Sequence, residues 1–342
     1  MATASHRNPA IDWIKGWMIL CIVLVHTWAF PQYRFHLAVD VFFFISGYYM
    51  MLSFLRKPTT AVLYTWKRIR VIALPFFICL LCRCCLDLGS FLSPGGMDGF
   101  VEKYAELLYT FSFAEEFGVS ISADQLLLGS WYFSVLIIGS FLLYGMLEFN
   151  ERLSSRILFP LIALFGFNAM IAHAESFSTW SRIATIGTPL IRGCSEMAAG
   201  ALICSVYTEN KSAFEKHAVF INLMGIVAGV LFILTIFSPT IVDKYLVITV
   251  PWFLLAAVLD NSWLSKSLDK IHGGIMSSIG QYTLYILCAH WPALILVHWC
   301  NETFLGHALH DVGLALVGIA VVSAASVLLY YVCKWIRAAC NK

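Results

Sequence analysis

Charged residues are scarce in this chain. Asp, Glu, Lys and Arg make up 12% of its 342 residues, whereas apolar types make up 60%. A soluble domain typically carries about 25% charged and about 45–50% apolar residues. The mean hydropathy is +0.80, and a lipid bilayer is the solvent that suits such a surface. The composition therefore excludes a water-soluble fold and predicts an integral membrane protein.

The chain also lacks a charge excess, an internal repeat and a disulfide framework. The formal net charge is +2, so charge gives no reason to expect a nucleic-acid partner. Most of the eleven cysteines lie in apolar runs, where free Cys is ordinarily a small buried side chain. The cluster Cys82, Cys84 and Cys85 admits a metal interpretation, but we favour packing and predict no metal.

Long apolar runs predict an all-α, polytopic transmembrane bundle that forms a single domain over residues 1–342. A span needs about 20 mostly apolar residues. About ten runs qualify, and 185–206 and 241–259 are the weakest. The predicted spans are 11–30, 37–55, 69–89, 128–148, 156–174, 185–206, 217–237, 241–259, 275–299 and 310–335.

The distribution of Lys and Arg predicts the orientation, because cytoplasmic loops are enriched in them. With the N-terminus inside, the outer segments hold only Arg34, Lys103, Arg182 and Lys244. Both termini are therefore predicted to be cytoplasmic, with segment 90–127 outside. Within that segment, 99–113 is expected to form a short amphipathic helix. No loop can hold a separate soluble domain, so any chemistry lies in or at the membrane.

Lys15 and His26 share one predicted helix. They are eleven residues apart, about three full turns, so they share a face and lie about 16 Å apart along the axis. A cation at the inner surface with an imidazole deep inside suits a long ligand such as coenzyme A, with phosphates at one end and a thioester at the other. The alternative is a snorkelling Lys and a helix–helix His.

A basic cluster opens the third predicted span, with Lys67, Arg68 and Arg70. Arg side chains suit phosphate oxygens, so these residues are candidates for binding the coenzyme phosphates. Ordinary positive-inside anchoring explains them equally well.

Other polar residues in predicted spans are candidates because charge at mid-bilayer is costly. Asp40 is a candidate to orient His26 or to activate an acceptor, or it is a helix N-terminal Asp. Arg192 and Glu196, four residues apart, predict an ion pair or a polar cavity lining. His290 is a second cavity histidine or an interhelical hydrogen-bonding group.

Taken together, these residues resemble the acyltransferase family 3 of membrane proteins. Residues 11–16 with His26 look like the family's opening helix, although Lys15 stands where many members have Arg. Residues 39–48 look like its Phe-Phe to Ser-Gly-aromatic signature, which includes Ser46. Supporting resemblances lie at 67–70 with Pro75, at 131–133, led by Trp131, and at 282–292, which ends in His-Trp-Pro.

The resemblance implies a stand-alone, acyl-CoA-dependent O-acetyltransferase-like enzyme of the cell (plasma or inner) membrane. It would move an acetyl or other acyl group from cytosolic acyl-coenzyme A to a hydroxyl or amine of a glycan or lipid-linked glycan. Its expected partners are membrane lipids and this acceptor, and a homo-oligomer is possible. The expected site is catalytic His26, Asp40 and His290; donor-binding Lys15, Lys67, Arg68 and Arg70; and substrate-binding Ser46, Trp131, Arg192 and Glu196.

A transporter or flippase for a polyprenyl-linked sugar or a small polar solute is the competing interpretation, because a bundle with buried charges suits it too. Transporters often show two related halves and helices broken at matching positions, and this sequence shows neither. A non-catalytic membrane sensor or partner subunit is the third class. The presence of His26, Ser46 and His290 argues against it.

Overall fold

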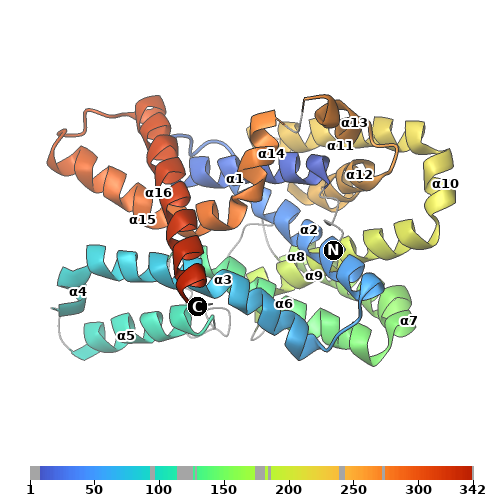
Figure 1. Ribbon diagram of the computed structural model, residues 1–342, viewed down its shortest axis with the longest axis horizontal. Coiled ribbons are helices and arrows are strands. Elements are labelled where there is room, and N and C mark those ends of the chain that lie inside the picture. The colour runs from blue at the N-terminus through green and yellow to red at the C-terminus, as the bar shows by residue number, and fades with distance from the viewer. Residues whose placement is uncertain are drawn as a thin grey trace.

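The computed structural model describes residues 8–92, 97–113, 126–127, 129–173, 182–183, 186–238, 243–271 and 274–340. Helices dominate it, as the all-α prediction requires (Figure 1). The strand pair among the described residues is a two-residue antiparallel ladder. The described helices and strands are α1 (Pro9–His26), η1 (Phe35–Leu37), α2 (Ala38–Arg56), α3 (Ala61–Leu86), α4 (Leu88–Leu92), α5 (Met97–Phe111), α6 (Ser130–Phe149), α7 (Glu151–Leu153), η3 (Ser154–Leu158), α8 (Phe159–His173), β1 (Arg182–Ile183), β2 (Ile186–Gly187), α9 (Thr188–Glu209), α10 (Lys211–Lys216), α11 (Ala218–Phe237), η4 (Asp243–Tyr245), α12 (Leu246–Val258), α13 (Trp263–Lys270), α14 (Gly274–Gln281), α15 (Thr283–Thr303) and α16 (Asp311–Cys340).

In the part of the chain that the structure describes, fewer helices qualify as spans than the predicted number of about ten. Among the described residues, eight helices are long and apolar enough to cross a membrane, and a ninth is gained if α12 and α13, bent by 53°, form one broken span. The predicted span 185–206 is present as the 22-residue helix α9. Helix α9 is not among the eight because polar and charged residues along its length lower its mean hydropathy.

Two span boundaries also differ from the prediction. The segment 275–299 is two helices, because α14 ends at Gln281 and the spanning helix α15 begins at Thr283. The third span begins earlier than predicted, at Ala61, where the Thr60 hydroxyl caps the Leu63 N–H at 3.2 Å. The basic cluster 67–70 therefore lies one to two turns inside α3.

Side-chain caps set the ends of the helices that position the site. The Asn8 side chain accepts hydrogen bonds from the N–H groups of Ala10 and Ile11, and Pro9 occupies the first turn of α1. Proline is well suited to that position because its missing N–H would have no helical partner. The Asn8 amide also donates to the Ala257 carbonyl at 3.0 Å. The start of α1 is thereby tied to the end of α12.

Close helix packing brings the site residues together. Gly47 of α2 faces the backbone of Met197 on α9, and Gly16 of α1 faces the backbone of Met276 on α14. A Cβ at either glycine would overlap those backbone atoms, and small residues at such contacts let transmembrane helices approach closely. Figure 1 shows α16 crossing beside α3 and α15. The core of the bundle lies along α1, α2, α6 and α9.

The helix expected over 99–113 is confirmed as α5. It packs against α3 through aromatic contacts, with the rings of Phe77 and Phe111 4.8 Å apart. The placement of this segment outside the cell and of both termini inside stays a prediction.

Candidate functional site

Two imidazoles, one half-buried and one fully buried, meet where α1 ends. The ring centroids of His26, the last residue of α1, and His290, in the middle of α15, are 5.0 Å apart and tilted by 32°. His290 is fully buried. The structure thus brings together the two histidines that the sequence singled out separately.

The hydrogen bonds of His290 fix which of its nitrogens is basic. His290 Nδ1 lies 2.7 Å from the Leu287 carbonyl oxygen. A carbonyl can only accept, so Nδ1 carries the hydrogen, and in the neutral ring Nε2 then bears the lone pair. Nε2 is buried and has no hydrogen-bond partner among the described residues, and the same holds for His26 Nδ1. Each unmet buried group costs free energy, so this pair suits a substrate that supplies the missing contacts.

Trp291 is a further member of this cluster that the sequence did not identify as a site residue. Its ring lies 6.1 Å from that of His26, and its indole N–H is buried with no partner in the described part of the chain. Trp28 stacks edge-on against it at 5.9 Å. The available sequence signal was the position of Trp291 beside His290 in the segment 282–292. That resemblance identified the segment but assigned no role to the indole.

Two residues of the basic cluster, Lys67 and Arg68, line a second feature, a cavity of about 650 Å³ between α2, α3 and α6. Lys67 and Arg68, both predicted to bind the donor, contribute to its wall together with Ser46, which was predicted to bind substrate. Lys57 and Thr59, in the turn before α3, add further polar side chains to the lining. We call this feature the basic cavity.

Arg68 is held firmly in the basic cavity. Its guanidinium donates to Ser140 Oγ at 2.8 Å and to the Ser46 carbonyl at 3.3 Å, and it lies 5.0 Å from the Tyr64 ring centroid. Three fixed contacts preorganise the remaining N–H groups for an anionic ligand. Ser140 could not be chosen from sequence, because it lies 72 positions from Arg68 in the chain. Tyr64 lies four residues before Arg68 on α3, so helical spacing could have indicated it.

Two predicted donor-binding residues lie elsewhere. Lys15 pairs with Asp12 on its own helix, with Nζ 2.5 Å from a carboxylate oxygen. Arg70 is exposed and lies over the Trp66 ring at 5.3 Å. Neither residue lines the basic cavity.

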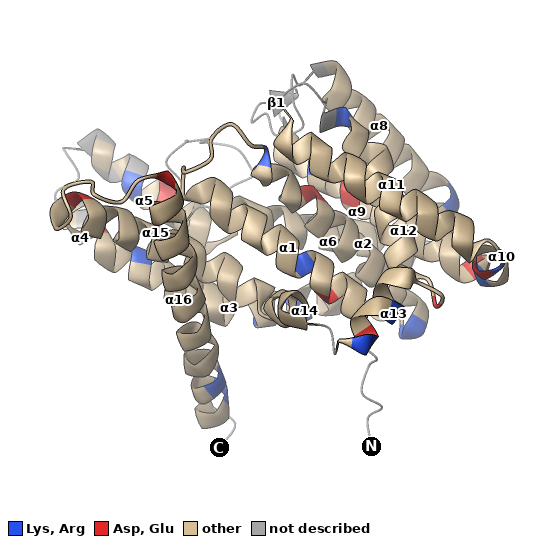
Figure 2. Ribbon diagram, turned by 90° about the horizontal axis from the view of Figure 1, so that it is seen from above, with Lys and Arg blue, Asp and Glu red and all other residues tan. Residues whose placement is uncertain are grey.

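Asp40, Arg192 and Glu196 form a buried charged triad. Arg192 Nε lies 2.5 Å from Asp40 Oδ1 and 3.5 Å from Glu196 Oε1. All three residues are at most 5% exposed. Figure 2 shows that red, acidic positions lie among the helices as well as at their ends. The predicted Arg192–Glu196 ion pair is present. Asp40, expected to hold His26, instead bonds to Arg192.

Trp131, the predicted lead residue of α6, is buried with its ring 6.2 Å from that of Phe43 on α2. Next to it, Tyr132 packs on the same phenylalanine at 4.8 Å. The Tyr132 hydroxyl forms a hydrogen bond with Ser46. This part of α6 therefore bridges α2 and the floor of the basic cavity.

The fold is a bundle of apolar helices that contains the imidazole pair and, separate from it, the basic cavity. This arrangement defines a multi-pass membrane protein with a polar site inside an apolar body. Residues 8–333 match the model of acyltransferase family 3, described as "Acyltransferase domain". The match covers nearly the whole chain, and the chain belongs to this family of acyltransferases. No curated protein and no solved structure matches it.

Proposed function

We propose that the protein transfers an acyl group, acetyl being the simplest, from cytosolic acyl-coenzyme A to a hydroxyl or amine of a cell-envelope glycan or related acceptor. The protein would lie in the cell membrane. The family match carries the acyltransferase assignment. The donor, the acceptor and the role of His26 are our proposal, and the observation that supports it best is the pair of unmet imidazole nitrogens of His26 and His290.

The proposed chemistry needs a base beside the acceptor. An imidazole lone pair of the His26–His290 pair takes the acceptor's O–H or N–H proton as its oxygen or nitrogen attacks the thioester carbonyl. The carbon–sulfur bond breaks, the acyl group stays on the acceptor, and the thiolate of coenzyme A leaves with the proton. Atoms and charge balance without a further reactant.

The basic cavity is the proposed site of the donor phosphates. Lys57, Lys67 and Arg68 place positive charge at its wall, and charge-assisted hydrogen bonds to phosphate are roughly twice as strong as neutral ones. Lys57 and Lys67 are exposed, whereas Arg68 is half-buried. A donor could therefore meet the lysines first and Arg68 deeper in the cavity.

The direct test follows free thiol released from acetyl-coenzyme A by the purified protein, with and without a candidate glycan. His26→Ala is expected to slow transfer by about 10²–10⁴-fold, the usual contribution of a general base. His217→Ala is the matched control, because His217 is exposed between α10 and α11 and its loss should leave the rate unchanged. Transfer at the full rate by His26→Ala would remove His26 from the mechanism.

A second measurement separates the two forms of the mechanism. If His26 carries the acyl group covalently before passing it on, labelled acetyl should remain on the protein when the acceptor is omitted, and His26→Ala should abolish the label. If His26 acts as general base, no label is retained. Uptake of a labelled solute without consumption of acetyl-coenzyme A would contradict both forms and favour a transporter.

A further inference from the structure

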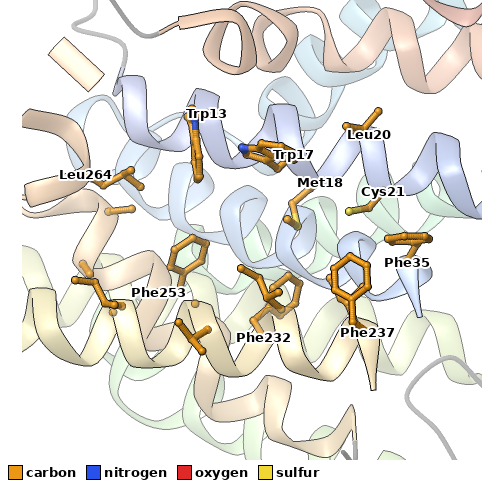
Figure 3. Close-up of a pocket in the computed structure, with 18 of the residues that line it drawn as sticks. Trp13, Trp17, Met18, Leu20, Cys21, Phe35, Phe232, Phe237, Phe253 and Leu264 are labelled. Atoms are coloured by element: carbon orange, nitrogen blue, oxygen red, sulfur yellow. The ribbon is translucent and has the colours of Figure 1, made fainter. Parts of the chain in front are cut away.

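A long apolar groove lies between α1 on one side and α11 and α12 on the other. Its volume is about 970 Å³. Along α11 it runs from Asn222 to Phe237, about 22 Å at the helical rise of 1.5 Å per residue. Figure 3 shows Trp13, Met18 and Cys21 on one wall facing Phe232 and Phe253 on the other. We call this feature the α1–α11 groove.

The α1–α11 groove is distinct from the imidazole pair. Trp13, Trp17, Cys21 and Leu24 line it from α1, and these positions recur every three to four residues along one face of the helix. His26 contacts His290 and Trp291 of α15, which pack on another side of α1. The groove therefore belongs to a face of α1 that the proposed chemistry does not use.

The lining gives an occupant almost no hydrogen-bonding side chain along the length of the groove. Asn222 is the main polar group on α11, and its amide is already used: Nδ2 donates to the carbonyls of Ala218 and Asn261, while Oδ1 accepts the Trp263 N–H at 2.8 Å. Water in such a groove would lose hydrogen bonds. A flexible hydrocarbon chain would lose none and would gain apolar contact.

The groove is open on its membrane side. Ile226, Val230 and Ile233 are each at least half exposed along it, so a chain can enter sideways from the bilayer. Gly229 leaves space in the groove beside the Phe253 ring, because even a Cβ at this position would lie against that ring. These features suit a lipid chain lying parallel to the helices.

One end of the groove carries positive charge. Ser267 of α13 lines it, and Lys270 lies one turn further on the same face of α13 and is exposed. Lys266 is also exposed, with Nζ 2.7 Å from Asn261 Oδ1. Asp269 is two residues from Ser267, so it points away from that face. An anionic head group at this end would meet a hydroxyl and an ammonium group together.

We propose that the α1–α11 groove is a binding site for one anionic phospholipid, with an acyl chain along Trp17 and Ile233 and its head group at Ser267 and Lys270. This proposal goes beyond the acyltransferase function and does not depend on it. The apolar lining holds the chain, and the lysine distinguishes an anionic from a zwitterionic head group.

The test uses the full-length protein in mild detergent, stripped of lipid and titrated with phosphatidylglycerol or phosphatidylcholine carrying the same acyl chains. Native mass spectrometry counts the bound lipid. The wild type should take up one phosphatidylglycerol in preference to phosphatidylcholine. Ile233→Trp, which fills the groove, should weaken binding of phosphatidylglycerol by about tenfold or more.

Leu231→Trp is the matched control, because Leu231 lies outside the lining on the opposite side of α11 and is 42% exposed. Lys270→Gln, at an exposed position that folding does not need, should cost about fivefold for phosphatidylglycerol and nothing for phosphatidylcholine. Equal binding by Ile233→Trp and Leu231→Trp, or an unchanged head-group preference in Lys270→Gln, would overturn the proposal.

Discussion

The imidazole pair and the charged triad are both polar clusters in an apolar bundle, but ion pairs join the members of the triad only. In the triad, Arg192 sits between two carboxylates, 2.5 Å from Asp40 and 3.5 Å from Glu196. In the pair, His26 Nδ1 and His290 Nε2 have no partner among the described residues. Among the described residues, Asp40 Oδ2, Arg192 Nη2 and Glu196 Oε2 of the triad are likewise buried without a hydrogen-bond partner. The difference is therefore that opposite charges hold the triad together, whereas no ion pair joins the two imidazoles.

The same comparison separates the helices. The triad joins α2 to α9, which are also packed closely at Gly47. The pair joins the end of α1 to α15, at the point where α1 stops being helical. We therefore expect variants of the triad to act on folding and variants of the pair to act on rate.

The largest effect on stability is expected from Arg192→Met. Removing one partner of a buried ion pair leaves uncompensated charge and typically costs about 3–5 kcal/mol. Here it leaves two carboxylates facing each other. Thermal unfolding in detergent should show a clear drop in the midpoint, whereas His26→Ala should unfold like the wild type. A stable Arg192→Met protein that had lost transfer would instead place the triad in the chemistry.

The sequence predicted only in part that the charged triad and the imidazole pair are separate clusters. Hydropathy located most of the spans, because a long run of apolar residues is most stable in the hydrocarbon core of a bilayer. It did not anticipate that Asp40 pairs with Arg192, 152 positions away in the chain, because hydropathy and helical periodicity describe one helix at a time. The Arg192–Glu196 pair was predictable, since both residues lie on one face of α9.

The candidate site shows the same limit. The face shared by Lys15 and His26 followed from helical periodicity alone, and residue motifs named His290. Which nitrogen of His290 is satisfied depends on the Leu287 carbonyl, and the walls of the basic cavity depend on where α6 packs against α3. The Leu287 contact lies within α15 and depends on the side-chain conformation of His290, whereas the cavity walls arise from the packing of helices, and a linear pattern contains neither.

The next effect tests the imidazole pair itself through His290→Gln. Gln can still donate to the Leu287 carbonyl, but it lacks a basic lone pair, so we expect about a 10²-fold fall in kcat with little change in KM for the donor. Steady-state kinetics against acetyl-coenzyme A measures both constants. A rise in KM alone would mean that His290 binds substrate and does not act in the chemical step.

A smaller effect is expected at the basic cavity. Arg68→Gln removes a charge that Ser140 and Ser46 hold in place, and the loss should weaken acetyl-coenzyme A binding by about tenfold or more. Arg70→Gln is the matched control, because Arg70 is exposed against Trp66 and does not line the cavity. Equilibrium binding of the donor needs no acceptor. Equal losses in the two variants would indicate general electrostatic attraction and no defined phosphate site.

The smallest effect is expected from Lys15→Gln, and it decides how the two ends of the donor are held. Lys15 is already paired with Asp12 and is partly exposed, and such pairs are worth about 0–1 kcal/mol. Donor affinity should therefore fall by less than about fivefold. A loss as large as that of Arg68→Gln would mean that the donor displaces Asp12 and lies along α1 between Lys15 and His26. In that case a single helix would hold both the phosphates and the thioester, and the basic cavity would be an accessory surface.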